Sequence, residues 1–145
     1  MSRIQDILAD KSPVVQVVSP SSTVLDAARK MHENRIGCLV VVDRQVVVGI
    51  ISERDMLEKI IVAQRDPQAT FVEDIMTQNV VCGRPETSIE EAQSVFKNRR
   101  IRHLPIVDDY GHLQGLISIG DINAAQAYAA EQTIHFLNEY LHGRT

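Results

Sequence analysis

The chain has 145 residues, of which 44% are hydrophobic and 23% are charged; this globular composition fits one domain or two small ones and excludes disordered and fibrous classes. No apolar run approaches the roughly 18 residues that cross a bilayer, and residues 1–10 mix charged with apolar side chains, so we expect a soluble, cytoplasmic protein with no membrane partner. The net charge of −4 and two widely spaced cysteines disfavour a dedicated nucleic-acid binder, a disulfide framework and a zinc cage.

The first half of the chain predicts a strand, a helix, a hairpin and a second helix. The apolar run at 14–18 is typical of a strand. A helix follows, because apolar residues recur at helical spacing at Val24, Ala27, Ala28 and Met31. Two β-branched runs at 38–42 and 46–51, separated by three polar residues, predict a hairpin, and the second helix begins at Ser52.

The second half repeats this order, because its residues align with those of the first half. The aligned pairs include Thr23 with Ser88, Arg35 with Arg100, and Gly49 with Gly115. The repeat predicts a strand at 80–82, strands at 104–107 and 113–117, and a helix that begins at Ser118 and runs past Tyr140. Its first helix carries the apolar stripe Ile89, Ala92 and Phe96.

These elements give an α/β fold of the α+β type, built from two pseudo-symmetric β-α-β-β-α repeats that pack sheet to sheet. We assign residues 1–64 to repeat one, 65–70 to a linker, 71–132 to repeat two and 133–145 to a C-terminal helical extension. The extension carries a further apolar stripe at Ile134, Leu137 and Leu141. This stripe either packs back on its own repeats or meets a second copy.

A Ser-x-x-Asp motif follows a strand in both repeats, as Ser52 with Asp55 and as Ser118 with Asp121. One interpretation is a capping box, in which the hydroxyl and the carboxylate satisfy the first turn of the next helix. The other is a grip on a vicinal diol such as ribose, with free helix N–H groups nearby for anions. Its recurrence after a strand in both halves favours the second interpretation.

The chain resembles a tandem pair of CBS domains, the cystathionine-β-synthase-type repeat also called a Bateman module. The motifs that carry the resemblance are Asp74-Ile-Met-Thr77, Ser88-Ile-x-Glu-Ala92, Arg100-Ile-Arg-His-Leu-Pro-Ile-Val-Asp108, Gly49-Ile-Ile-Ser-Glu-Arg-Asp55 and Gly115-Leu-Ile-Ser-Ile-Gly-Asp121. They cover the chain from about Ile4 to Tyr140. The tail is similar to the last helix of small bacterial stand-alone CBS-pair proteins. Because members of this family commonly pair into disc-like dimers, the resemblance favours contact of the tail with a second copy, and we expect a homodimer.

The resemblance implies a regulatory module without catalytic activity that binds an adenosyl ligand between the repeats: AMP, ADP, ATP, a dinucleotide or S-adenosylmethionine. It implies no catalytic cofactor and no metal, and a protein target that the sequence does not identify. By resemblance, Asp121 with Ser118 and Asp55 with Ser52 hold ribose hydroxyls. The cleft is completed before each middle strand by Ile101, Arg102, His103, Ile36, Gly37 and Cys38, and in the adenine slot by Val14 and Val80.

The two clefts differ in charge, because Arg102 and His103 align with Gly37 and Cys38. A guanidinium suits phosphate well, so we expect the cleft of Asp121 to bind the nucleotide more tightly. Since each cleft in this family takes residues from both repeats, the alternative is that Arg102 serves the cleft of Asp55.

Other classes of function stay open beside this one. A structural or scaffolding dimer with vestigial clefts is one, and a redox role for Cys38 is another. The basic run 97–103 raises the possibility of nucleic-acid binding, but the run has no interleaved aromatic residue for base stacking, which disfavours nucleic acid as a partner. Catalytic motifs such as the P-loop, HExxH and GxSxG are absent, so we expect no enzyme.

Overall fold

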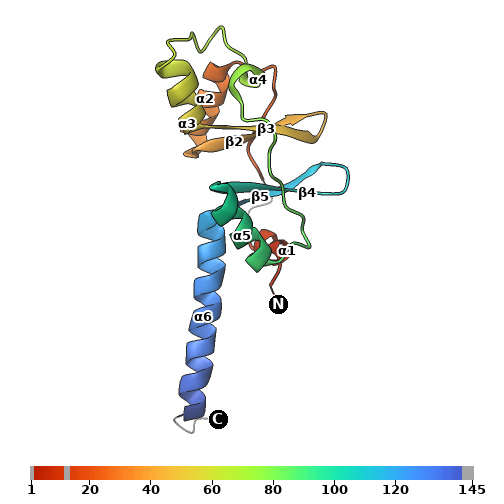
Figure 1. Ribbon diagram of the computed structural model, residues 1–145, viewed down its shortest axis with the longest axis vertical. Coiled ribbons are helices and arrows are strands. Elements are labelled where there is room, and N and C mark those ends of the chain that lie inside the picture. The colour runs from red at the N-terminus through yellow and green to blue at the C-terminus, as the bar shows by residue number, and fades with distance from the viewer. Residues whose placement is uncertain (1, 12–13, 142–145) are drawn as a thin grey trace.

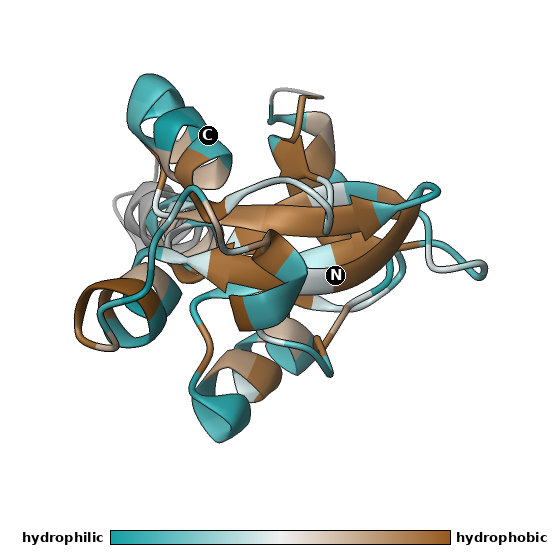
Figure 2. Cartoon of the chain, turned by 90° about the horizontal axis from the view of Figure 1, so that it is seen from above, coloured by the Kyte–Doolittle hydropathy of each residue, from teal (hydrophilic) through white to brown (hydrophobic). Residues whose placement is uncertain are grey.

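The computed structural model describes residues 2–11 and 14–141, and side chains in this range as far as Gln132. It has a mixed α+β fold with two small sheets side by side at the centre and helices on their outer sides (Figure 1). In Figure 2 the strands are mostly in the hydrophobic colour, whereas the helices carry both hydrophobic and hydrophilic residues. The expected fold class is confirmed.

The first sheet has the order β1-β2-β3, with β1 (Val17–Val18) parallel to β2 (Cys38–Asp43) and β2 antiparallel to β3 (Val46–Ser52). Its covering helices are α2 (Val24–Asn34), α3 (Glu53–Met56) and the π-helical turn η1 (Leu57–Ile61). The predicted stripe on α2 is confirmed at Val24, Ala27 and Met31, which are buried. These residues pack against Leu39 and Ile51 of the sheet, in one hydrophobic core.

The second sheet pairs β4 (His103–Val107) with β5 (Leu113–Ser118), and its helices are α5 (Ile89–Arg99) and α6 (Ile119–Leu141). The stripe on α5 is confirmed, because Ile89, Ala92 and Phe96 are buried in a second core with Leu104 and Ile117. Ile134, Leu137 and Leu141 of the expected dimer stripe lie outside the described side chains.

The strand expected at 80–82 is wrong: in the described chain only a single parallel bridge, Gly83 with Ile106, joins this segment to β4. The Gly83 N–H donates to the Pro105 carbonyl, and the Val107 N–H donates to the Gly83 carbonyl. Extending a parallel ladder toward residue 81 requires an N–H from residue 105, and proline has none. The first repeat has Val40 at this position, and there the ladder forms between Val17 and Val40.

Two short helices that the periodicity did not predict connect the halves crosswise. Helix α1 (Ile4–Ala9) stands at the start of repeat one but packs on the second sheet, and α4 (Val72–Ile75) stands at the start of repeat two but packs on the first (Figure 1). Ile4 is fully buried in the second core, and Val72 is fully buried in the first. Each core therefore contains a helix from the other side of the linker.

Candidate functional site

Two cavities open where the halves meet. The larger has a volume of about 560 Å³, and we call it the Asp55 cavity. It is lined by both repeats, at Gly37, Cys38, Ile50, Ser52, Glu53, Arg54, Asp55, Thr77, Asn79, Val80, Val81, Arg100, Ile101, Arg102 and His103. The smaller, of about 360 Å³, is the Lys11 cavity. Its lining is Leu8, Lys11, Val14, Val15, Gln16, Ile36, Gly37, Cys38, His103, Gln114, Gly115 and Leu116.

The structure distributes the predicted site residues between these cavities. Five of them line the Asp55 cavity alone: Ser52, Asp55, Val80, Ile101 and Arg102. Val14 and Ile36 line the Lys11 cavity, whereas Gly37, Cys38 and His103 line both. Ser118 and Asp121 line neither, although Asp121 contacts Lys11.

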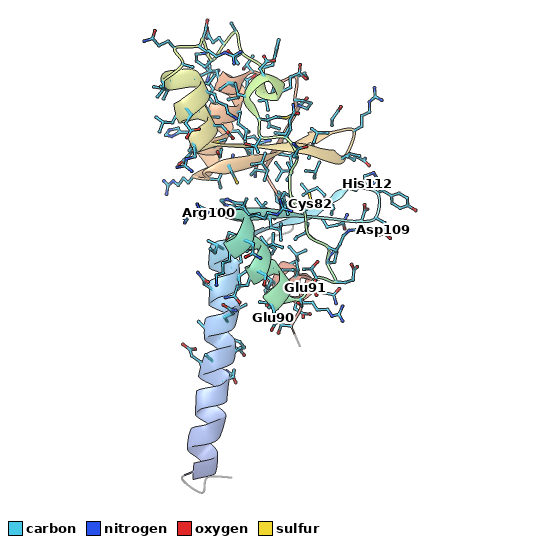
Figure 3. All side chains as sticks on the ribbon, viewed as in Figure 1. Cys82, Glu90, Glu91, Arg100, Asp109 and His112 are labelled. Atoms are coloured by element: carbon cyan, nitrogen blue, oxygen red, sulfur yellow. The ribbon has the colours of Figure 1, made fainter. Side chains whose placement is uncertain are left out.

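Arg102 lines the cavity of Asp55 and not a cavity wall beside Asp121, which favours the alternative that Arg102 serves the cleft of Asp55. The physical reason is the packing of the two sheets. The segment before β4 leaves helix α5 at the level where the halves meet, as the position of Arg100 in Figure 3 shows. Its cationic side chains therefore lie opposite the β3–α3 junction of the other repeat.

Both Ser-x-x-Asp motifs form capping boxes. The Ser52 N–H donates to Asp55 Oδ2 at 3.0 Å, and the Asp55 N–H donates to Ser52 Oγ at 3.2 Å. The Ser118 N–H donates to Asp121 Oδ2 at 2.8 Å, and the Asp121 N–H donates to Ser118 Oγ at 3.1 Å. The capping interpretation is thus confirmed for both, and for Asp55 it coexists with a position on a cavity wall.

Asp55 is buried and has four donors around its carboxylate. Its Oδ1 accepts from Lys59 Nζ at 3.0 Å and from the Thr77 hydroxyl at 3.3 Å, and its Oδ2 accepts from the N–H and the hydroxyl of Ser52. Lys59 Nζ also donates to the Ile75 carbonyl at 2.8 Å, and Lys59 does not line the cavity. The two hydroxyls are the exchangeable donors, because each can rotate toward a bound diol.

Asp121 is paired with a lysine from the other end of the chain. Lys11 Nζ lies 2.7 Å from Asp121 Oδ2 and also donates to the Leu116 carbonyl at 2.8 Å. Burial acts to raise the pKa of Asp121, but the hydrogen bonds from Lys11 and Ser118 and the charge of Lys11 outweigh it and lower that pKa. Asp121 is therefore ionised, and its negative charge is already paired with the ammonium of Lys11.

Two groups in the wall shared by the cavities have shifted pKa values. Burial lowers the pKa of His103, and the nearby charges of Arg102 and Lys11 lower it further, so the imidazole is neutral at pH 7. Burial, with the nearby Glu53, raises the pKa of the Cys38 thiol to about 11. Cys38 is consequently protonated at neutral pH, which removes the thiolate that redox chemistry requires.

Sequence reasoning missed Lys11, Lys59 and Thr77. Thr77 lies in the Asp74-Ile-Met-Thr77 motif, but only the crosswise packing of α4 brings it to Asp55. Lys11 aligns with Asn79, and the repeat therefore carries no signal for a cation at that position.

Within the part of the chain that the structure describes, no cluster of three or more His, Cys, Asp and Glu side chains is arranged to hold a metal ion. None of the helices described there is both long and apolar enough to cross a bilayer.

Comparison with known proteins identifies relatives for both halves. The mitochondrial CBS domain-containing protein CBSX3 of Arabidopsis thaliana is 40% identical over 126 residues, which are 83% of this chain and 61% of that protein. The chain thus spans less than two thirds of that relative. The structure of a protein with CBS domains from Burkholderia ambifaria superposes with a TM-score of 0.79 and 38% identity, covering 86% of this chain and 93% of the other.

A third relative was solved with a nucleotide. The crystal structure of CBSX2 in complex with AMP has a TM-score of 0.77 and 26% identity, and it covers 90% of this chain and 99% of that chain. The family model of the CBS domain matches residues 4–62 and 72–128. The chain belongs to the CBS domain family, and it carries two copies of that domain.

Proposed function

We propose that this CBS pair is a non-catalytic regulatory module that binds an adenine nucleotide in the Asp55 cavity and signals to a partner protein. The observation that carries the proposal is that Asp55 and Arg102, one from each repeat, line the same cavity. The complex of the related CBSX2 with AMP supports an adenine nucleotide as the ligand.

The residues of the Asp55 cavity have the chemistry that each part of a nucleotide requires. The Asp55 carboxylate accepts hydrogen bonds from the ribose hydroxyls, which replace the Ser52 and Thr77 hydroxyls as donors. Arg102 and Arg100 neutralise the phosphate, and Arg102 offers a planar fork that suits phosphate oxygens. Ile50, Val80 and Val81 supply apolar surface for the base.

The position of the arginines also bears on the nucleic-acid alternative. Arg100 and Arg102, two of the cations in the basic run 97–103, line the cavity together with Asp55. A small phosphate ligand accounts for this charge, and the chain has only six Tyr and Phe residues and no Trp for base stacking. A mononucleotide is therefore the better match for the run.

Isothermal titration of AMP into two matched variants tests the proposal. Asp55→Asn removes the charged acceptor of the diol, and we expect it to weaken AMP about ten- to a hundredfold, since a charge-assisted hydrogen bond contributes roughly 1.5–3 kcal/mol. Asp121→Asn is the matched control and should leave the affinity nearly unchanged. A larger loss from Asp121→Asn than from Asp55→Asn contradicts the choice of cavity, and absence of binding by the wild type favours a scaffolding dimer.

The phosphate contact is tested in the same titrations. Arg102→Ala should weaken AMP but leave adenosine unchanged, because adenosine has no phosphate to contact. Arg99→Ala is the control, since Arg99 ends helix α5 and does not line the cavity. Equal losses for AMP and adenosine contradict a phosphate role for Arg102.

A further inference from the structure

The two capping boxes have the same geometry, but the charged groups beside them that face the cavities are of opposite sign. In the first repeat the carboxylate of Asp55 lines its cavity, and its partner Lys59 does not. In the second repeat the order is reversed, because Lys11 lines the cavity and its partner Asp121 does not. A ligand that enters the smaller cavity therefore meets an ammonium group where the larger cavity offers a carboxylate.

The ammonium of Lys11 is held in place from two sides. Its Nζ donates to both Asp121 Oδ2 and the Leu116 carbonyl, at 2.7 and 2.8 Å. Its backbone follows α1, which is anchored on the second repeat because the Ile4 N–H donates to the Thr87 carbonyl and Leu8 packs against Gly115. The pair is thus fixed by the packing of the N-terminal helix.

We propose that Lys11 is a specificity-determining residue that closes the cleft of Asp121 to ribose, so that each chain binds one adenine nucleotide, in the Asp55 cavity. The inference rests on the proposed function for its ligand class. It adds which of the two clefts is used and the residue that decides it.

The relative strength of the donors supports this assignment. The Lys11 ammonium is a charged donor to a charged acceptor, and such hydrogen bonds are roughly twice as strong as those from a neutral hydroxyl. An uncharged diol, such as that of adenosine, would also leave the Lys11 ammonium without a counter-ion if it displaced Lys11 from Asp121. Among the described residues that line the Lys11 cavity there is no arginine to bind a phosphate in compensation, and the histidine among them, His103, is neutral at pH 7.

Calorimetric titration of the full chain with AMP and with adenosine tests the proposal. Wild type should bind one ligand per chain. Lys11→Met keeps an unbranched apolar stem but removes the charge, and it should gain a second, weaker site, with adenosine as the more sensitive probe. Lys11→Arg, the matched control, keeps the charge and should retain one site. Adding Asp121→Asn to Lys11→Met should remove the second site again.

The outcomes separate this inference from the proposed function. Two sites in wild type, or one site in Lys11→Met, overturn the role of Lys11 while leaving the Asp55 cavity as the nucleotide site. Binding of adenosine by Lys11→Met alone, through Asp121, overturns the choice of the Asp55 cavity but supports the role of Lys11. Absence of binding by every variant overturns both.

A second measurement does not depend on ligand. The carboxyl carbon of Asp121 can be titrated by NMR in wild type and in Lys11→Met. Loss of the ammonium should raise the pKa of Asp121, because the hydrogen bond and charge of Lys11 both act to lower it. An unchanged pKa shows that the pair does not form in solution and overturns the proposal.

Discussion

His103 is the basic side chain among the described residues in the wall that the two cavities share. It begins β4 opposite Ser118, and Arg102, Lys11 and Asp121 all act on its charge. Burial and the two cations lower its pKa, whereas Asp121 acts to raise it. The folded protein therefore holds this imidazole in its neutral form more strongly than the unfolded chain does.

This difference predicts a loss of stability in mild acid. Below the usual pKa of 6.5 the unfolded chain takes up a proton at His103 while the folded protein does not, so the free energy of unfolding falls as the pH drops from 6.5 toward the lowered pKa. Urea unfolding at pH 7.5 and 5.5 measures the fall. His103→Asn should reduce it, and His32→Asn, at an exposed position, should not. Equal pH dependence in wild type and His103→Asn contradicts the prediction.

Most of the site residues predicted from the sequence lie on a cavity wall, but the structure pairs Arg102 with Asp55, whereas the sequence reasoning favoured Asp121. The motif before β4 identified Ile101, Arg102 and His103, and all three line a cavity. An alignment of two repeats shows which residues correspond, but it does not show which repeat a connecting segment faces. Pairing Arg102 with Asp55 required the relative position of the two sheets.

At the scale of elements, the two crosswise segments, at α1 and at α4, lie against glycines in the last strand of each sheet, Gly49 in β3 and Gly115 in β5. A Cβ at Gly49 would lie 2.6 Å from Met76 Sδ and 3.0 Å from the Thr77 carbonyl oxygen, just beyond α4. A Cβ at Gly115 would collide with Leu8 of α1. Because these aligned glycines have no side chain, the segments at α1 and α4 can approach the strands closely.

Alanine at these positions should therefore destabilise the protein. We expect Gly49→Ala to lower the free energy of unfolding by about 1–3 kcal/mol, since overpacking costs this much and the Thr77 backbone cannot move as a side chain can. Gly115→Ala should cost less, because the end of Leu8 can turn away. Gly120→Ala is the control: its Cβ would meet only Ser118 Oγ at 3.5 Å, and alanine favours the helix. Chemical denaturation that ranks Gly120→Ala as the most destabilising variant contradicts this account.

The main helices and hairpins were predictable, because their apolar spacing repeats in two copies. The stripes of α2 and α5 are buried as the spacing predicts. Helices α1 and α4 span only six and four residues, which is too short for a periodic pattern to identify. The missing strand at 80–82 was also predictable from Pro105, since a proline in a middle strand interrupts the hydrogen-bond ladder on one side.

At the scale of the whole molecule, a single copy of the chain exposes apolar side chains to solvent on two of its surfaces. Helix α6 extends away from the rest of the protein over much of its length, and Tyr128 on it is exposed (Figure 1). On the first repeat, Leu57, Ile61 and Val62 are also exposed, at and just after η1. Either surface suits contact with a second copy.

Truncation after Tyr128 distinguishes these surfaces. We expect the full chain to be a dimer and the truncated chain a monomer, because an extended helix needs a partner to bury its apolar side chains. Light scattering measures both masses, and Ile61→Asp in the full chain is the matched variant, which should remain dimeric. A truncated chain that is still fully dimeric contradicts the prediction and places the interface on the repeats.

The crosswise placement of α1 and α4 also sets the order in which the protein folds during synthesis. The first core lacks Val72 and Ile75 until α4 has left the ribosome, well past the end of repeat one. Helix α1 packs later still. The N–H groups of Ile4 and Gln5 donate to the carbonyls of Thr87 and Pro85, which are made after α4. Helix α1, although it is made before most of repeat one, is therefore among the last elements to pack, and Ile4, Ile7 and Leu8 stay accessible to chaperones until repeat two has emerged.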